Sequence, residues 1–189
     1  MKSAELDSVL IIGCGSKSGP DLSPEASRKT VKNIPDWYLN TPVNDGYQYA
    51  AAEATSQSMQ LAVDKARVAA VSNLSQMIKS EWNGYTKRVQ EETGMGADSK
   101  LLDQFSTTQE NVISNQLENV IVKEKEIQVE NSGGTRIYRT FVLVELDENA
   151  AQAKLLAQIK ADQQLYDAIK ASELIDEMEQ KVEAYRQRK

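Results

Sequence analysis

Residues 118–130, ENVIVKEKEIQVE, and residues 135–147, TRIYRTFVLVELD, decide the fold of this chain. Both stretches carry the β-branched and aromatic residues that favour strands. Asn131, Ser132, Gly133 and Gly134 lie between them and are typical of a tight hairpin turn. The sequence therefore predicts an antiparallel β-hairpin here.

A further strand is expected earlier in the chain, from about residue 46 to 54. Tyr47, Tyr49 and Ala51 alternate with Gln48 and Ala50, and this period of two is typical of a strand. The strand follows the turn-forming sequence at residues 44–46, Asn-Asp-Gly. Together with the hairpin, it predicts a small sheet.

An alanine-rich helix is expected directly after this strand, with Thr55 or Ser56 as its N-cap. Its many alanines permit a close approach to a sheet. The apolar residues that fall on one helical face are Met59, Val63, Ala66, Ala70, Leu74 and Met77. The fold class expected is therefore α+β, a small sheet with a packed alanine-rich helix, followed by a long C-terminal helix.

Residues 78–93 fit two interpretations. Ile78, Trp82, Tyr85 and Val89 recur at helical spacing, whereas Gly84 and the aromatic, β-branched content allow a twisted edge strand. We expect the strand. After a break at residues 94–98, a shorter amphipathic helix is predicted over about residues 98–115.

Residues 148–189 contain neither glycine nor proline, and their apolar residues recur three to seven positions apart. We expect one long helix of roughly 60 Å, at about 1.5 Å per residue. A domain of about a hundred residues is too small to cover its whole length. The apolar stripe over residues 150–188 is therefore expected to meet a helical partner or a second copy of the chain, the alternative being that it folds back on the sheet.

Composition limits the chemistry that the chain can perform. The 189 residues include no histidine and one cysteine, and the net charge is −6. Histidine-based catalysis and zinc sites built from histidine or several cysteines are excluded. Scattered lysines and arginines argue against a nucleic-acid surface. We expect a protein that is not an enzyme, with no cofactor, no metal site and no nucleic-acid partner.

The stretch VLIIGCGSKSG at residues 9–19 resembles two different motifs. One is a phosphate-binding glycine loop, but the spacing G-x-G-x-x-x-G and four prolines between residues 20 and 42 exclude the helix that such a loop requires. The other is the cleavage site of a bacterial lipoprotein, in which Cys14 would become the lipidated first residue. We expect lipid attachment at Cys14 and a flexible Gly/Ser/Pro tether over residues 15–34.

The leader before Cys14 departs from a standard export signal. Glu5 and Asp7 lie within it, and its apolar core is about five residues long where roughly 7–15 are usual. Residues 1–14 are therefore interpreted as a degenerate or truncated lipoprotein signal. The alternatives are a start further upstream, an altered leader, or a cytoplasmic protein.

Residues 35–46 are expected to form an extended strap fixed by prolines, with the structural residues Pro35, Trp37, Tyr38 and Gly46. The two aromatic residues are interpreted as hydrophobic clamps on the sheet. Glu53 is expected to accept hydrogen bonds from backbone N–H groups near the start of the helix.

Residues 34–147 resemble a family of small bacterial outer-membrane lipoproteins typified by a twenty-kilodalton lipoprotein antigen, whose relatives include ring proteins of the flagellar motor. Pro35, Trp37, Tyr38, Gly46 and Glu53 match its P-x-W-Y, D-G-Y and G-E-A motifs, although Ala52 replaces the usual glycine. The resemblance implies a compact, non-enzymatic α+β domain, over residues 35–147, held at the outer membrane by a lipidated cysteine and assembled into rings in some members.

The function expected is therefore that of a periplasm-facing outer-membrane lipoprotein with a structural or assembly role, oligomeric and with a possible place in the flagellum. Outer-membrane lipid would be its partner through acylated Cys14. A soluble periplasmic ligand-binding module, in which the segment from Trp37 to Tyr49 closes over a pocket on the sheet, is the alternative.

Overall fold

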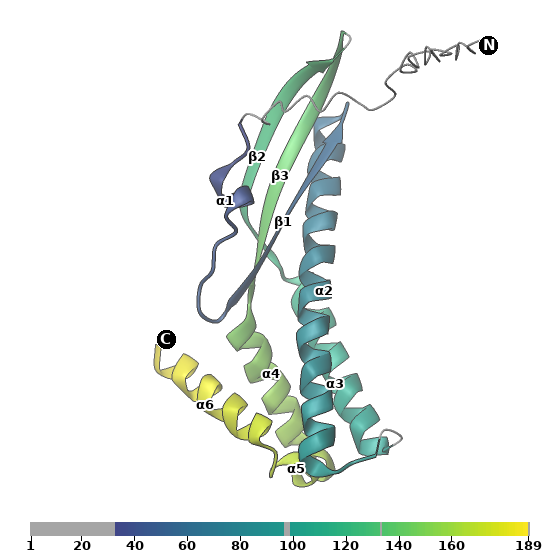
Figure 1. Ribbon diagram of the computed structural model, residues 1–189, viewed down its shortest axis with the longest axis vertical. Helices are drawn as coiled ribbons and strands as arrows, with labels where there is room; N and C mark the ends of the chain where they lie inside the picture. Colours follow the sequence, from purple (N-terminus) through teal and green to yellow (C-terminus); the bar gives the residue numbers. More distant parts are fainter. Residues whose placement is uncertain (1–32, 97–98, 133, 189) are drawn as a thin grey trace, which may run out of the picture. The chain divides into compact units, whose positions relative to one another are not determined.

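The computed structural model describes residues 33–96, 99–132 and 134–188 (Figure 1). Cys14, the expected signal at 1–14 and nearly all of the expected tether lie outside these residues. The described residues pack as one compact unit, so residues 147 and 148 do not mark a boundary between separately packed parts. The elements, in order, are α1 (Asp36–Leu39), β1 (Tyr47–Ser56), α2 (Met59–Thr93), α3 (Lys100–Glu118), β2 (Ile121–Ser132), β3 (Thr135–Asp147), α4 (Glu148–Ala161), α5 (Gln163–Ile169) and α6 (Glu173–Arg188).

The three strands form one antiparallel sheet in the order β1-β3-β2. The β2–β3 hairpin is confirmed, with Ser132 opposite Thr135, and a bulge interrupts β2 between Val122 and Glu124. The first strand is confirmed as β1, which pairs with β3 from Tyr47–Asp147 to Ser56–Tyr138. The α+β class predicted from the sequence is thus the class observed.

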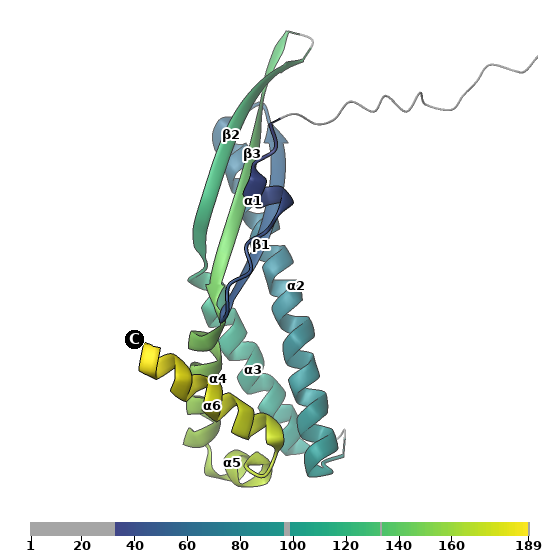
Figure 2. The same cartoon turned by 60° about the vertical axis from the view of Figure 1, so that its left-hand side comes forward.

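The two faces of the sheet are covered differently (Figures 1 and 2). Val142 and Val144 of β3 belong to the main core with α2. Phe141 and Leu143 point to the opposite face because successive side chains of a strand alternate, and both are buried. On that second face, the Tyr38 ring of α1 meets the Phe141 ring edge-on at 5.0 Å.

The alanines of α2 allow the helix to lie close to the sheet, as predicted. Ala66, Ala70 and Leu74 are fully buried, but Met59 and Met77, expected on the same face, are each half exposed. The helix also begins later than expected. Strand β1 continues to Ser56, so Ser58 serves as the N-cap and accepts a 3.4 Å hydrogen bond from Leu61 N.

The edge strand expected over residues 78–93 was wrong, because α2 continues through this segment to Thr93. Ile78, Trp82 and Val89 keep their helical spacing and are buried in the core. Gln109 of α3 donates a 3.3 Å hydrogen bond to the carbonyl of Trp82. Burial against other helices therefore outweighs the local strand propensity, and the helix ends at Gly94, whose φ is +69°.

The C-terminal segment is helical, as expected, but it is divided into α4, α5 and α6, which corrects the prediction of one uninterrupted helix. Asp162 leaves helical geometry and caps α5 by accepting a 3.0 Å hydrogen bond from Leu165 N. The chain turns again at residues 170–172, and α6 then packs against α4. Folding back in this way covers the apolar stripe, whose buried members are Leu155, Leu156, Ile159, Leu165, Ile169, Leu174, Ile175, Met178 and Val182.

The cover for this stripe is provided mainly by α2, α3 and by the C-terminal helices themselves. The alternative of folding back is thus the observed outcome, with helices rather than the sheet as the main support. A second copy or a helical partner at residues 150–188 stays a prediction, but it is no longer needed to bury these side chains.

Candidate functional site

The strap differs locally from the expected extended form, because residues 36–39 form one helical turn that begins after Pro35. Pro35 is buried, and Trp37 and Tyr38 are half-buried. Tyr38 contacts Phe141 on the sheet, and Trp37 lies edge-on to Tyr38 at 6.4 Å. The strap thus places an aromatic pair on the second face of the sheet.

Gly46 closes the strap at a position that admits no side chain. Its φ is +79°, and a Cβ there would lie 1.7 Å from Nδ2 of Asn149. Its carbonyl accepts hydrogen bonds from Glu148 N at 2.9 Å and from Asn149 N at 3.4 Å. The predicted structural residue Gly46 therefore joins the strap to the beginning of α4.

Glu53 does not accept hydrogen bonds from a helix start, which corrects the expectation. Its two carboxylate oxygens accept hydrogen bonds from Nη1 of Arg139 at 2.9 and 3.0 Å. Nε of Arg139 donates a hydrogen bond to Glu130 at 2.7 Å. These carboxylates raise the pKa of Arg139 and Arg139 lowers that of Glu130. The cluster ties the three strands together on one face of the sheet.

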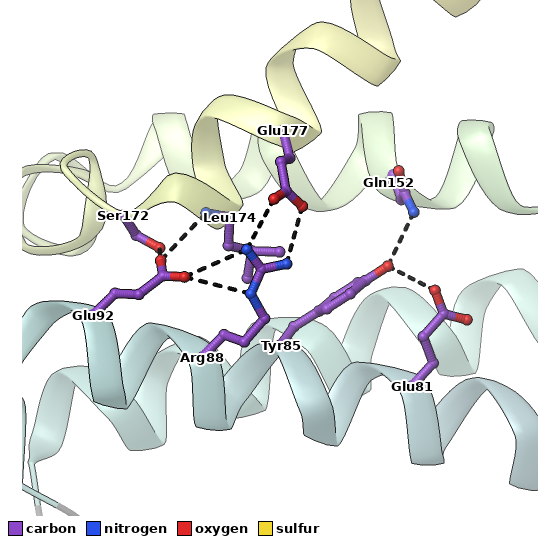
Figure 3. Close-up of polar contacts among 8 residues, drawn as sticks. All are labelled: Glu81, Tyr85, Arg88, Glu92, Gln152, Ser172, Leu174 and Glu177. Atoms are coloured by element: carbon purple, nitrogen blue, oxygen red, sulfur yellow. Dashed lines mark hydrogen bonds and ion pairs between the residues drawn. The ribbon is translucent and has the colours of Figure 1, made fainter.

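A polar clamp joins the end of α2 to the beginning of α6 (Figure 3). Arg88 contacts Glu177 through Nη1 at 2.9 Å and through Nη2 at 3.0 Å. Glu92, one turn further along α2, accepts hydrogen bonds from the hydroxyl of Ser172 and from Leu174 N, the latter at 3.3 Å. Glu92 thus satisfies a backbone N–H at the start of α6, as a capping residue does.

The contacts of this clamp favour the ionised forms of its two carboxylates. The hydrogen bond from Ser172, followed by those from Leu174 N and Arg88, lowers the pKa of Glu92. The pKa of Glu177 is lowered by Arg88. Both carboxylates therefore favour their ionised form, in which they hold α6 against α2.

A second polar cluster lies earlier in α2 than the clamp and reaches β1 and α4. The hydroxyl of Tyr85 donates to Glu81 at 2.7 Å, and Gln48 of β1 donates to the same carboxylate. Gln152 of α4 donates to the Tyr85 oxygen at 3.2 Å and to Glu148 at 2.6 Å. These five residues connect three elements through one network (Figure 3 shows Glu81, Tyr85 and Gln152).

This second cluster holds more acceptors than donors. Glu148 has a raised pKa, because it is removed from water and because the Glu81 carboxylate repels its charge, while Lys181 partly offsets both effects. Burial, followed by Glu81, also raises the pKa of Tyr85. Oε1 of Gln48 and Oε1 of Gln152 are buried without a hydrogen-bond donor in the described part of the chain. A proton retained by Glu148 would reduce this excess of acceptors.

Three of the hollows at the surface of the described residues adjoin the strap or the helices. One of about 440 Å³ lies between α2 and α3 and includes Trp82, Gln109 and Ile113. Another, of about 420 Å³, lies beside the strap between Pro42, Tyr49 and Met77. The third, of about 620 Å³, runs between α4 and α6. The space directly beneath α1 is filled by Tyr38 and Phe141, so the strap covers no large pocket there.

Sequence reasoning missed both polar clusters. Arg88 and Glu92 are four residues apart on one helix, which is a detectable local signal. Their partners Ser172, Leu174 and Glu177 lie eighty or more positions away, and nothing local links the two segments. The geometry that results holds the C-terminal helices in place.

Other features of the described residues bear on metal and membrane binding. Over residues 33–96, 99–132 and 134–188, no cluster of three or more acidic, histidine or cysteine side chains has the geometry of a metal site. Within the same ranges, no helix combines the length and the apolar character needed to cross a membrane. Comparison of the chain with protein-family models, with characterised proteins and with solved structures finds no match.

Proposed function

We propose that the protein is a non-enzymatic lipoprotein of the bacterial outer membrane, with a structural or assembly role on its periplasmic side. The observation that carries the proposal is Cys14, which follows Ile11-Ile12-Gly13 and precedes a Gly/Ser/Pro-rich segment. The resemblance of residues 34–147 to the outer-membrane lipoprotein family points the same way.

The first described residues are attached to the rest of the fold, so a force applied through such an anchor would be transmitted to the fold. The carbonyl of Asn33, the first described residue, accepts a hydrogen bond from Gln128 of β2. The strap that follows contacts the sheet through Tyr38 and reaches α4 through Gly46. A tether ending at residue 34 would therefore pull on the sheet and on α4 together, rather than on a loose terminus.

The polar clusters support a structural role in the same way. Their hydrogen-bond partners are other side chains and backbone groups of the chain, and the clusters connect α2 with α4 and α6. Such contacts fix the relative positions of helices. We propose that they maintain a stiff module, held near the membrane by lipid on Cys14.

Stable attachment requires more than one acyl chain, because a single chain gives only marginal binding and each buried CH₂ contributes about 0.8 kcal/mol. The test is fractionation of bacterial envelopes that contain the wild-type chain or Cys14→Ser. The proposal expects the wild type in the outer-membrane fraction and the variant in the soluble fraction. Equal distribution of the two chains would reject the lipid anchor.

A ligand-binding module is the second candidate, and the hollow beside the strap favours it. Its lining combines the polar and aromatic side chains of Tyr47, Gln48 and Tyr49 with the apolar ones of Pro42 and Met77. A change in tryptophan fluorescence with cell-wall fragments or lipids, lost in Trp37→Phe but kept in Trp82→Phe, would support binding there. An unchanged spectrum across such a panel would count against it.

A further inference from the structure

The first half of α2 carries apolar side chains on the face turned away from the sheet. Leu61 is 46% exposed and Val68 is 69% exposed. The inward face of the same turns is occupied by Ala62, Ala66 and Ala70, which are fully buried. Contacts with α3 lie further along the helix, near Trp82 and Thr86. The outward face of the first half therefore lacks a covering element in the described part of the chain (Figures 1 and 2).

Four residues form a single stripe on this outward face. Leu61, Asp64, Lys65 and Val68 follow the spacing i, i+3, i+4, i+7 that places side chains on one side of a helix. They border a shallow hollow of about 460 Å³, whose remaining lining residues are Ala69 and Ser72. Two apolar residues thus flank one negative and one positive charge.

This order of residues is self-complementary. If a second α2 lies antiparallel, with a two-fold axis between positions 64 and 65, Leu61 faces Val68 of the second copy. Asp64 then faces Lys65 of the second copy, and the same two contacts are repeated by symmetry. Like charges do not meet in this arrangement, and each apolar residue is opposite another apolar residue.

We propose that the Leu61–Val68 face of α2 is a self-association surface that binds a second copy of this chain in antiparallel orientation. The charge pattern favours this occupant, because an unrelated apolar helix would leave Asp64 and Lys65 without opposite charges. The inference does not depend on the lipid anchor. It also differs from the oligomer contact expected at residues 150–188, whose apolar side chains are largely buried within the chain.

The contact covers two helical turns, so it is small. Interfaces below about 1,200 Å² of total buried area are typical of weak, transient association. We therefore expect a dimer that dissociates on dilution, with half-association between about 10 µM and 1 mM. The alanines on the opposite side of α2 remain packed on the sheet in both states.

Charge exchange at positions 64 and 65 tests both the surface and its orientation. Sedimentation velocity of the full chain, with reductant to keep Cys14 from forming a disulfide, measures dimerisation over this concentration range. Asp64→Lys alone, or Lys65→Asp alone, places like charges opposite each other twice per dimer. Each single variant is expected to dimerise about tenfold more weakly than the wild type.

Two combinations should restore association. The double variant Asp64→Lys/Lys65→Asp again pairs opposite charges, and so does an equimolar mixture of the two single variants. Lys87→Asp is the matched control, since Lys87 is an exposed cation of the same helix outside the stripe. Its dimerisation is expected to equal that of the wild type.

Each other outcome contradicts the proposal in a specific way. A wild-type chain that stays monomeric across the range has no such surface. A dimer that Val68→Glu and the single charge variants leave unchanged uses another face. Weakening by the single variants without recovery in the double variant or in the mixture would exclude the antiparallel pairing.

Discussion

Arg88 of α2 donates hydrogen bonds to Glu177 of α6 from both terminal nitrogens, at 2.9 and 3.0 Å, although the two residues are 89 positions apart in the sequence. Both side chains are partly exposed, so water screens their attraction and the gain is modest. Glu177→Gln is expected to lower the free energy of unfolding by about 0.5–1 kcal/mol at low salt. Urea denaturation measures this, and the difference should shrink at high salt.

Glu183→Gln is the control for this prediction, because Glu183 is an exposed carboxylate of the same helix, beyond its first turn and outside the clamp. We expect no comparable loss in that variant. Equal losses in the two variants would indicate an effect of charge on α6 as a whole, and would remove the role given to Arg88.

The ionisation of Glu92 makes the stability of the fold depend on pH. Its folded-state pKa lies below the ordinary value of 4.5, so ionised Glu92 stabilises the fold above that value. This stability is lost as the pH falls through the lowered pKa. Glu92→Gln should be less stable than the wild type by up to about 1 kcal/mol at neutral pH. Thermal unfolding followed by circular dichroism should show the two chains converging in acid.

Glu148 gives stability the opposite dependence on pH, because its pKa is raised rather than lowered. Its pKa is raised above 4.5, by burial first and by Glu81 second, although Lys181 lowers it. The protonated form therefore stabilises the fold below pH 4.5, and this contribution is lost as the pH rises through the raised pKa. Glu148→Gln keeps a hydrogen-bond acceptor for Gln152 but cannot ionise.

This Glu148 variant is expected to be more stable than the wild type at neutral pH, by on the order of 1 kcal/mol, and equal to it in acid. The same series of thermal scans measures the difference. A variant that is less stable at neutral pH would mean that the ionised carboxylate is needed, and would contradict the stabilising role given to the proton on Glu148.

Gly46→Ala tests the junction between the strap and α4. A Cβ at φ +79° is strained, and it would also meet the amide of Asn149. We expect a loss of about 1–3 kcal/mol in chemical denaturation. Gly84→Ala is the matched control, since a Cβ there has open space within 4 Å inside α2. That change should instead stabilise the protein by about 0.5–1 kcal/mol.

If Gly46→Ala proves as stable as the wild type, the junction is more adaptable than the close approach to Asn149 indicates. The double variant Gly46→Ala/Asn149→Ala separates the two costs, because it removes the clash and leaves the backbone strain. It should recover part of the loss.

The hairpin and the first strand were predictable because their signals are local. The turn at Asn131–Gly134 and the alternation of Tyr47, Tyr49 and Ala51 each lie within a few residues. The alanines at 66 and 70 likewise marked the side of α2 that meets the sheet. In these elements, local propensity and tertiary packing favour the same structure.

The predictions failed where tertiary packing or helix capping outweighed the local sequence pattern. Gly84 and Trp82 suggested a strand, yet burial of Trp82 against α3 keeps the segment helical. The breaks near Asp162 and Ser172 carry no glycine or proline. Asp162 caps α5 and Glu92 accepts the N–H of Leu174 in α6, and both roles depend on where the chain turns. Arg88 and Glu177 could not be paired from sequence, because only the folded chain brings them together.

Intact mass spectrometry of the purified protein shows whether Cys14 carries a lipid anchor. The full gene is expressed in a bacterium, and wild type is compared with Cys14→Ser. If Cys14 is lipidated, the wild type is a mature chain that begins at Cys14 and carries added acyl mass, and both features are absent from the variant. A wild-type chain with neither cleavage at residue 14 nor added acyl mass would contradict the lipid anchor.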